Sequence, residues 1–137
     1  MKRLLPIVIA LVLAGCTGSP EKTAATPTTA PVPADDAAAV RVLRQVNTAQ
    51  AAYLKRNRRY ALSYDELVQA HLIDADPAKS AAGYEINLRP SADAESYTMA
   101  AIPLTPAANT KFFYTDKSGV IRVEQGKEAN ASSPPLS

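Results

Sequence analysis

Residues 36–60, DAAAVRVLRQVNTAQAAYLKRNRRY, are the stretch that decides the fold. Apolar side chains recur there every three or four residues, which is the periodicity of a helix, and neither glycine nor proline interrupts them. We therefore predict one amphipathic helix followed by a short basic segment, with Asp35 or Asp36 capping the first turn. The main apolar positions are Val42, Val46, Ala49 and Tyr53. A helix with such a face needs a surface to pack against, which the rest of the chain must supply.

Downstream of this helix, the sequence predicts a short second helix and then an antiparallel sheet. Ser63-Tyr64-Asp65-Glu66 is a capping box, which predicts a helix from about Tyr64 to His71. Apolar and polar side chains then alternate, so that strands are expected at residues 84–89, at 97–101, from 112 onward and at 120–123. The fold class is therefore α+β, with one long and one short helix packed on a three- to four-stranded antiparallel sheet. The expected core is Tyr53, Leu67, Leu72, Ile86, Met99, Phe112 and Val120.

Residues 1–17 carry targeting features. Lys2 and Arg3 form a positive segment, and residues 4–13 form an apolar one that is too short to cross a bilayer as a helix. Leu13-Ala14-Gly15-Cys16 then resembles the lipobox of bacterial lipoprotein signal peptides. In that family the cysteine is lipidated and the peptide is cleaved before it, so the resemblance implies a covalent lipid on Cys16 and a lipid-anchored protein of the cell envelope. Thr17 stands where an aspartate would signal inner-membrane retention, which implies the outer membrane, facing the periplasm.

Two other interpretations of this N-terminal segment stay open. It can be an ordinary secretory signal whose cleavage site contains a cysteine, or an anchor that is not cleaved. The lipoprotein interpretation is favoured because the charged segment, the length of the apolar segment and the cysteine box agree. Stable membrane attachment also takes more than one acyl chain, and a lipoprotein cysteine carries three.

The expected domain organisation has four parts. Residues 1–15 are the signal peptide, and residues 16–35 are the lipidated cysteine with a linker rich in proline, threonine and alanine. The linker can reach at most roughly 60 Å at about 3.1 Å per residue. Residues 36–124 form the α+β domain. Residues 125–137 are polar and rich in serine and proline, and we expect them to be disordered.

The charge balance and the cysteine count bear on nucleic-acid binding and on disulfide formation. The chain has 15 basic and 13 acidic residues, and cleavage of the signal peptide removes Lys2 and Arg3 to leave a neutral mature chain. Net charge thus gives no argument for a nucleic-acid partner. Cys16 is the only cysteine, so no intramolecular disulfide can form.

The predicted domain also resembles a known family over roughly residues 40–123. Residues 47–53, NTAQAAY, Tyr60, the leucines at 62, 67 and 72, and the hairpin 113–122 resemble the globular headgroup of type IV pilin-like proteins and type II secretion pseudopilins. The resemblance implies an α+β fold and a module that works through surface contacts. Pilins begin with a prepilin-peptidase site and a continuous apolar helix that drives filament assembly. The lipobox and linker replace both here, so we do not expect an ordinary filament subunit.

Catalytic chemistry has little support in the sequence. His71 is the only histidine, and it has Asp65, Glu66, Asp74 and Asp76 near it in sequence. These residues can form a weak metal cluster or an acid–base pair. Alternatively, His71 occupies the C-terminus of the second helix, where partial positive charge is favourable. Nucleophile-elbow and phosphate-loop motifs are lacking. We predict a protein that is not an enzyme and that has no metal or cofactor apart from the lipid on Cys16.

The charge pattern gives a candidate interaction surface. No acidic residue lies between Asp36 and Asp65, although the basic residues there are numerous. The surface comprises Arg41, Arg44, Lys55, Arg56, Arg58 and Arg59 with Tyr60 and Tyr64, and its arginines and tyrosines are typical of binding hot spots. Arg41, Arg44, Lys55 and Arg59 are expected to share the solvent side of the helix. The alternatives are a merely solvated helix face neutralised by nearby acids, and ordinary helix–loop packing of the arginines and tyrosines.

Together these observations predict a non-enzymatic, membrane-anchored lipoprotein that acts as a protein-interaction or structural module of the cell envelope. Its partner would be an envelope protein, such as a component of a pilus or secretion system, and not nucleic acid. The alternative is a periplasmic lipoprotein that binds a small ligand in a groove between helix and sheet. The oligomeric state stays open.

Overall fold

The computed structural model describes residues 34–74, 77 and 81–137. The predicted signal peptide, Cys16 and nearly all of the linker lie outside these residues, as does Asp76.

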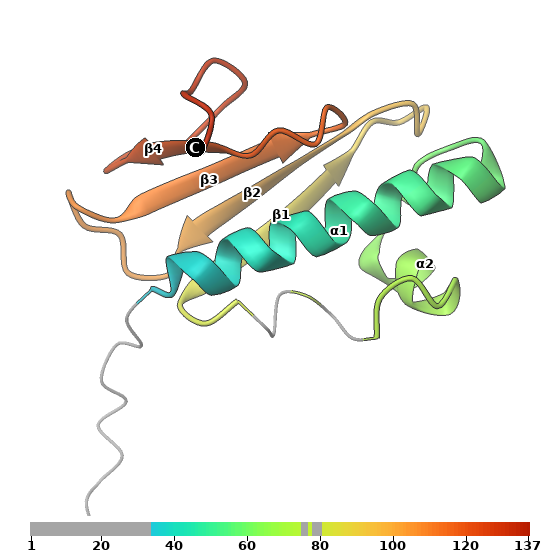
Figure 1. Cartoon of the computed structure of the whole chain (residues 1–137), viewed down its shortest axis with the longest axis horizontal. Coiled ribbons are helices and arrows are strands. Elements are labelled where there is room, and N and C mark those ends of the chain that lie inside the picture. The colour runs from blue at the N-terminus through green and yellow to red at the C-terminus, as the bar shows by residue number, and fades with distance from the viewer. Residues whose placement is uncertain (1–33, 75–76, 78–80) are drawn as a thin grey trace, which may run out of the picture.

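The described chain is α+β (Figure 1). Its elements in chain order are α1 (Asp36–Asn57), α2 (Tyr64–Gln69), β1 (Tyr84–Pro90), β2 (Tyr97–Pro103), β3 (Lys111–Asp116) and β4 (Arg122–Gln125). The strands form one antiparallel sheet in the order β1-β2-β3-β4, and α1 lies across one face of it (Figure 1). This confirms the predicted fold class.

Both ends of α1 follow from local backbone chemistry. The Asp35 carboxylate accepts a hydrogen bond of 3.0 Å from the Ala38 N–H and so satisfies an otherwise unpaired donor of the first turn. At the other end Arg58 adopts a left-handed conformation with φ of 60°, and its N–H donates to the Leu54 carbonyl at 2.9 Å. The helix therefore ends at Asn57, and the basic segment leaves it.

The Ser63 half of the predicted capping box is formed, whereas the Glu66 carboxylate bonds to the residue before the N-cap, and α2 is shorter than predicted. Ser63 Oγ accepts from the Glu66 N–H at 3.3 Å, while the Glu66 carboxylate accepts from the Leu62 N–H at 3.1 Å. The helix ends at Gln69, since His71 takes a left-handed conformation with φ of 54° that no continuing helix allows.

The last strand begins later than predicted. The chain turns at Gly119, whose φ of 75° suits glycine, and Val120 remains on the turn with 40% of its surface exposed. Ile121 takes the buried position instead, and β4 starts at Arg122. The prediction that Val120 is a core residue is therefore wrong.

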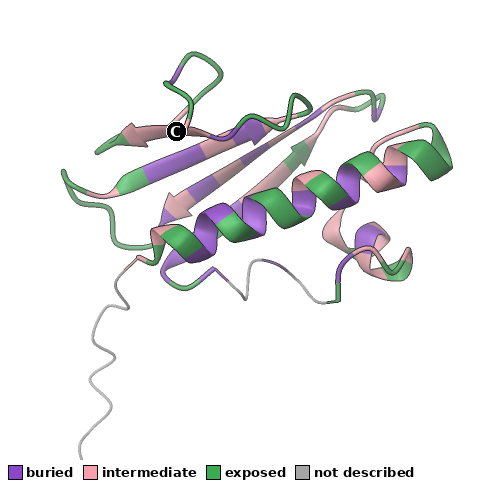
Figure 2. Cartoon of the chain, in the orientation of Figure 1, coloured by how far each residue is buried: buried purple, intermediate pink, exposed green. Residues whose placement is uncertain are grey.

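The core lies between the apolar face of α1 and the sheet (Figure 2). From the predicted core, Tyr53, Leu67, Ile86 and Met99 are in this cluster, and Leu72 is partly buried against it. Phe112 is also buried, but it alternates with Phe113 along β3, and Phe113 is the member of the cluster. The residues of α1 in the cluster are Ala39, Val40, Val42, Leu43, Val46, Ala49 and Tyr53.

One polar side chain, Gln50, is fully buried in this helix face. Its amide nitrogen donates to the Ala61 carbonyl at 3.1 Å, and its side-chain oxygen accepts from the Ala61 N–H at 2.9 Å. Ala61 is itself fully buried, in a segment without secondary structure. Gln50 thus supplies both backbone partners that this buried loop residue needs.

The C-terminal residues differ from the prediction. Residues 133–136, which we call the strap, return along the outer edge of β4 and form an antiparallel bridge between Pro135 and Arg122. The Val123 N–H donates to Pro134 and the Leu136 N–H donates to Ile121, at 3.0 and 2.8 Å. Disorder over 125–137 was therefore the wrong expectation. The strap is ordered because it satisfies the exposed edge of β4.

Replacing Gln50 should strongly destabilise the domain. We expect Gln50→Ala to lower the free energy of unfolding by about 3 kcal/mol, because it leaves both polar groups of Ala61 buried without partners and opens a cavity. The matched control is Gln45→Ala at an exposed position of the same helix, with an expected change of about 0.5 kcal/mol or less. Urea unfolding followed by circular dichroism measures both. Equal midpoints for the two variants would contradict the assigned role.

Removing the strap should free the edge of β4. In a chain that ends at Ser132, the Val123 amide loses its acceptor, so its hydrogen exchange should accelerate by roughly tenfold or more. The Met99 amide in β2, which has neighbouring strands on both sides, should retain its protection. Exchange monitored by NMR tests this, and an unchanged Val123 rate would show that the strap does not protect the edge.

Candidate functional site

The predicted basic surface is divided between separate places in the structure. Arg41 and Arg44 are exposed on the N-terminal half of α1. Lys55 and Arg56 are exposed in its last turn, where positive charge favours the helix dipole, and Arg56 also donates to the Ala70 carbonyl at 3.2 Å. Arg58 is exposed at the C-cap. Six cations that are near in sequence therefore do not form one continuous patch.

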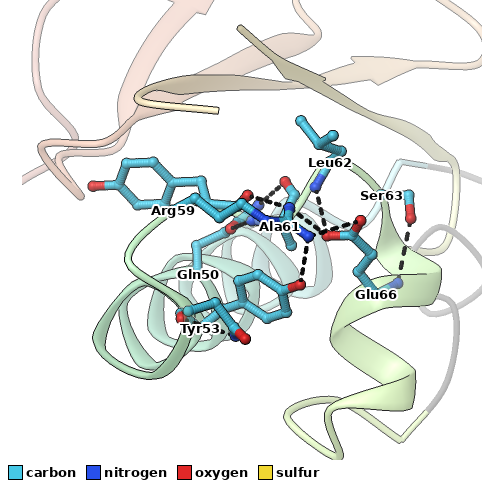
Figure 3. Close-up of polar contacts among 9 residues, drawn as sticks. Gln50, Tyr53, Arg59, Ala61, Leu62, Ser63 and Glu66 are labelled. Atoms are coloured by element: carbon cyan, nitrogen blue, oxygen red, sulfur yellow. Dashed lines mark hydrogen bonds and ion pairs between the residues drawn. The ribbon is translucent and has the colours of Figure 1, made fainter. Parts of the chain in front are cut away.

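Arg59 folds back toward the domain and does not join Arg41 on the solvent side of the helix. Its guanidinium donates to Glu66 Oε2 at 2.9 Å and to the Tyr53 hydroxyl at 3.1 Å (Figure 3). Its guanidinium carbon also lies 5.3 Å from the centroid of the Tyr53 ring. The side chain therefore joins α1 to the start of α2, and its placement on a shared solvent face was wrong. A residue beyond the helix end no longer follows the helix periodicity.

Glu66 and Tyr53, the two side chains that Arg59 contacts, both have shifted pKa values. The hydrogen bond from Arg59 lowers the pKa of Glu66, and the bond from the Leu62 N–H adds to this. Burial raises the pKa of Tyr53, and the nearby Glu66 carboxylate adds to that. Among the described residues, Arg59 is the one cation of the predicted surface that an acid neutralises.

The two candidate tyrosines pack against the domain. Tyr60 makes an edge-to-face contact with Tyr97, with ring centroids 5.0 Å apart. The Tyr64 hydroxyl donates to the Ile86 carbonyl of β1 at 3.3 Å. Both residues are partly buried, so ordinary helix–loop packing accounts for them better than a binding hot spot does.

The structure brings Arg41 and Arg44 to a groove instead. The groove has a volume of about 490 Å³ and lies between the N-terminal half of α1, β3 and the strap. Its walls are apolar at Val40, Phe113 and Leu136. The remaining lining residues are Asp36, Ala37, Arg41, Arg44 and Lys111. A second hollow of about 250 Å³ shares Arg44 and Leu136 with it and extends to Gly119, Val120 and Ile121.

The charged groups of the groove are only partly paired. Lys111 Nζ lies 3.0 Å from Asp36 Oδ2, and the Tyr84 hydroxyl donates to Asp36 Oδ1 at 2.6 Å. Burial raises the pKa of Tyr84, and its bond to Asp36 raises it further. Within the described ranges, neither Arg41 nor Arg44 has an ion-pair partner. Within the described lining, the two cations without an ion pair both come from α1 and lie beside apolar side chains.

Sequence reasoning found part of this site. Arg41 and Arg44 were candidates, and a groove between helix and sheet was the expected place for a ligand. Lys111 and Leu136 were missed, since Leu136 belongs to a segment that we expected to be disordered. Phe113 was recognised only as a strand residue. Alternation along β3 is the signal that places it beneath the helix, because Phe112 and Phe113 must face opposite sides.

His71 does not form the predicted alternative site in the described chain. It is exposed just after α2, and the described residues contain no group of three or more histidine, cysteine, aspartate or glutamate side chains suited to a metal. Asp76, one of the four acids considered with it, lies outside the described residues. No helix among residues 34–74, 77 and 81–137 is both long and apolar enough to cross a bilayer.

The Arg59–Glu66 pair should make stability depend on pH. Because the folded-state pKa of Glu66 is lowered, its contribution is present above the ordinary glutamate pKa of about 4.3 and is lost as the pH falls through the folded value. Glu66→Gln should cost about 1 kcal/mol at neutral pH, since the pair is part exposed, and progressively less below about pH 4. Urea unfolding at several pH values checks this. Glu85→Gln, at an exposed site on β1, is the control and should show no such trend.

Comparison of the chain with protein-family models, with curated proteins and with solved structures finds no match.

Proposed function

We propose that the chain is a non-enzymatic, membrane-anchored interaction module of the cell envelope, and that its recognition surface is the groove between α1, β3 and the strap. The observation that carries this proposal is the pair of exposed arginines, Arg41 and Arg44, beside an apolar hollow of about 490 Å³. Arginine beside apolar surface is the composition that protein interfaces favour.

The anchoring part of the proposal is supported by the sequence. The Leu13-Ala14-Gly15-Cys16 box resembles a lipobox, and the linker that follows enters the domain directly before Asp36, which lines the groove. The Asp35 N–H donates to the Ala82 carbonyl at 3.0 Å, so the point of entry is fixed on the domain. The tether would therefore join the domain beside the groove.

The resemblance to pilin and pseudopilin headgroups supports an interaction role and suggests the setting. An α+β headgroup without the assembling apolar helix would act beside a pilus or secretion machine and not as an ordinary subunit of its filament. An outer-membrane position facing the periplasm belongs to the same proposal, through Thr17 after the lipidated cysteine.

A second candidate function is small-ligand binding at the same groove. The volume of about 490 Å³ favours it, because ligand pockets in proteins are typically about 300–1,000 Å³. This candidate differs from the first in a checkable way, since a small ligand would leave no cross-linked protein at the groove.

Site-specific photo-cross-linking in living cells tests the proposed function. A photoreactive amino acid replaces Arg44 in the groove, or Lys55, which is exposed on the same helix about 16 Å further along. We expect one recurrent envelope protein at position 44 and a much weaker adduct at position 55. Arg44→Glu should then reduce capture of that protein by roughly tenfold, whereas Lys55→Glu should have little effect. Equal adducts at both positions, or lipid adducts alone, would contradict the proposal.

A further inference from the structure

The groove has the shape of a trough and not of a closed pocket. The α1 side runs from Asp36 to Arg44, which spans about 12 Å at 1.5 Å per residue. The second hollow continues it past Arg44 and Leu136 to the β3–β4 turn, where Val120 is 40% exposed. An extended chain advances about 3.3 Å per residue, so the first hollow alone has the length of about four residues.

Positive charge is in excess in the trough. Of the described residues that line the first hollow, three are cations and Asp36 is the only acid, which Lys111 and Tyr84 already bind. Arg41 and Arg44 are three positions apart and therefore lie on the same side of the helix. Their planar guanidinium groups match carboxylates in geometry and can bind them with two parallel hydrogen bonds.

The floor and one wall of the trough are apolar. Phe113 and Val40 are buried to within 2% and 9% exposure, and the partly buried Leu136 forms the opposite wall. Phe113 and Val40 are thus already largely removed from water, whereas Ala37 is exposed and Leu136 is partly exposed. An apolar side chain laid against Ala37 and Leu136 would remove their surface from water and contribute to binding.

We propose that the trough binds an extended, acidic segment of the partner protein that carries large apolar side chains between its carboxylates. The carboxylates bind Arg41 and Arg44, and the apolar side chains lie against Ala37 and Leu136. This inference rests on the proposed function and adds the chemistry of the partner to it. Complementarity of charge and the length of the trough are the observations that select this occupant.

A synthetic peptide tests the inference. The probe is a fluorescent, capped peptide, Gly-Glu-Asp-Leu-Glu-Leu-Asp-Gly, titrated with the full chain held in nanodiscs of zwitterionic phosphatidylcholine. We expect saturable binding by fluorescence anisotropy, which weakens as salt is raised. Replacing both leucines of the probe by serine should weaken binding by roughly tenfold or more, since each buried leucine contributes strongly. The same peptide with lysines in place of its acids should not bind.

Two variants of the chain separate the groove from general electrostatics. Arg44→Glu should weaken binding of the acidic peptide by roughly tenfold, because an attraction becomes a repulsion. Lys55→Glu makes the same change of charge outside the trough and should leave the affinity within about twofold. Circular dichroism of both variants verifies that each is folded, as expected for exposed positions.

Several results would overturn the inference. These are equal affinity for the acidic and basic peptides, equal effects of Arg44→Glu and Lys55→Glu, or no saturable binding. Self-association of the chain that Arg44→Glu abolishes, without peptide binding, would assign the trough to a second copy. Binding to vesicles of anionic phosphatidylglycerol that Arg44→Glu abolishes and Lys55→Glu does not, without peptide binding, would assign it to lipid. A protein cross-linked at position 44 without peptide binding would retain the interaction module and reject only this partner chemistry.

Discussion

The structure depends on the burial of one helix face against one sheet. The apolar stripe of α1, from Ala39 to Tyr53, packs on residues of β1, β2 and β3 that include Ile86, Met99 and Phe113. A short domain has few other sources of stability, because its surface is large relative to its volume. The polar contacts described above act around this layer. Gln50 satisfies the buried loop after the helix, Arg59 joins that loop to α2, and the strap covers the edge of β4.

This arrangement also decides which basic residues are available for binding. A loop that turns back along the helix follows the C-terminal end of α1. Arg59 stabilises this loop through its hydrogen bonds to Glu66 and Tyr53, so its charge is not available for binding. The N-terminal half of α1 is bordered on one side by β3 and the strap, whose side chains leave a hollow beside Arg41 and Arg44. The difference between the two groups of cations is therefore one of position in the fold and not of residue type.

Periodicity was sufficient for the main elements because burial imposes it directly. Val42, Val46 and Tyr53 predicted the helix, and alternation around Ile86 and Met99 predicted the strands.

The errors arose where long-range contacts decide the structure. The strap contains little apolar surface, and its order comes from backbone hydrogen bonds to β4 that composition does not encode. Arg59 looked like a member of the helix pattern, but a left-handed Arg58 ends the helix before it. The same dependence on periodicity explains why only part of the candidate site was predicted. Arg41 and Arg44 lie on a helix whose periodicity is visible in the sequence, whereas Leu136 lies on the strap, which has no periodic pattern.

Because Leu136 lines the groove, the groove depends on the strap. One wall comes from α1 and the other from a residue at the opposite end of the chain, held by a hydrogen bond from its N–H to Ile121 and by the bridge at Arg122. The groove therefore exists only when the β4 edge is covered, and an extended segment that competed for this edge would remove the wall. Since edge strands readily pair with other chains, the strap both protects the sheet and maintains the site. Stability of the sheet edge and recognition at the groove are thus coupled through the same four residues.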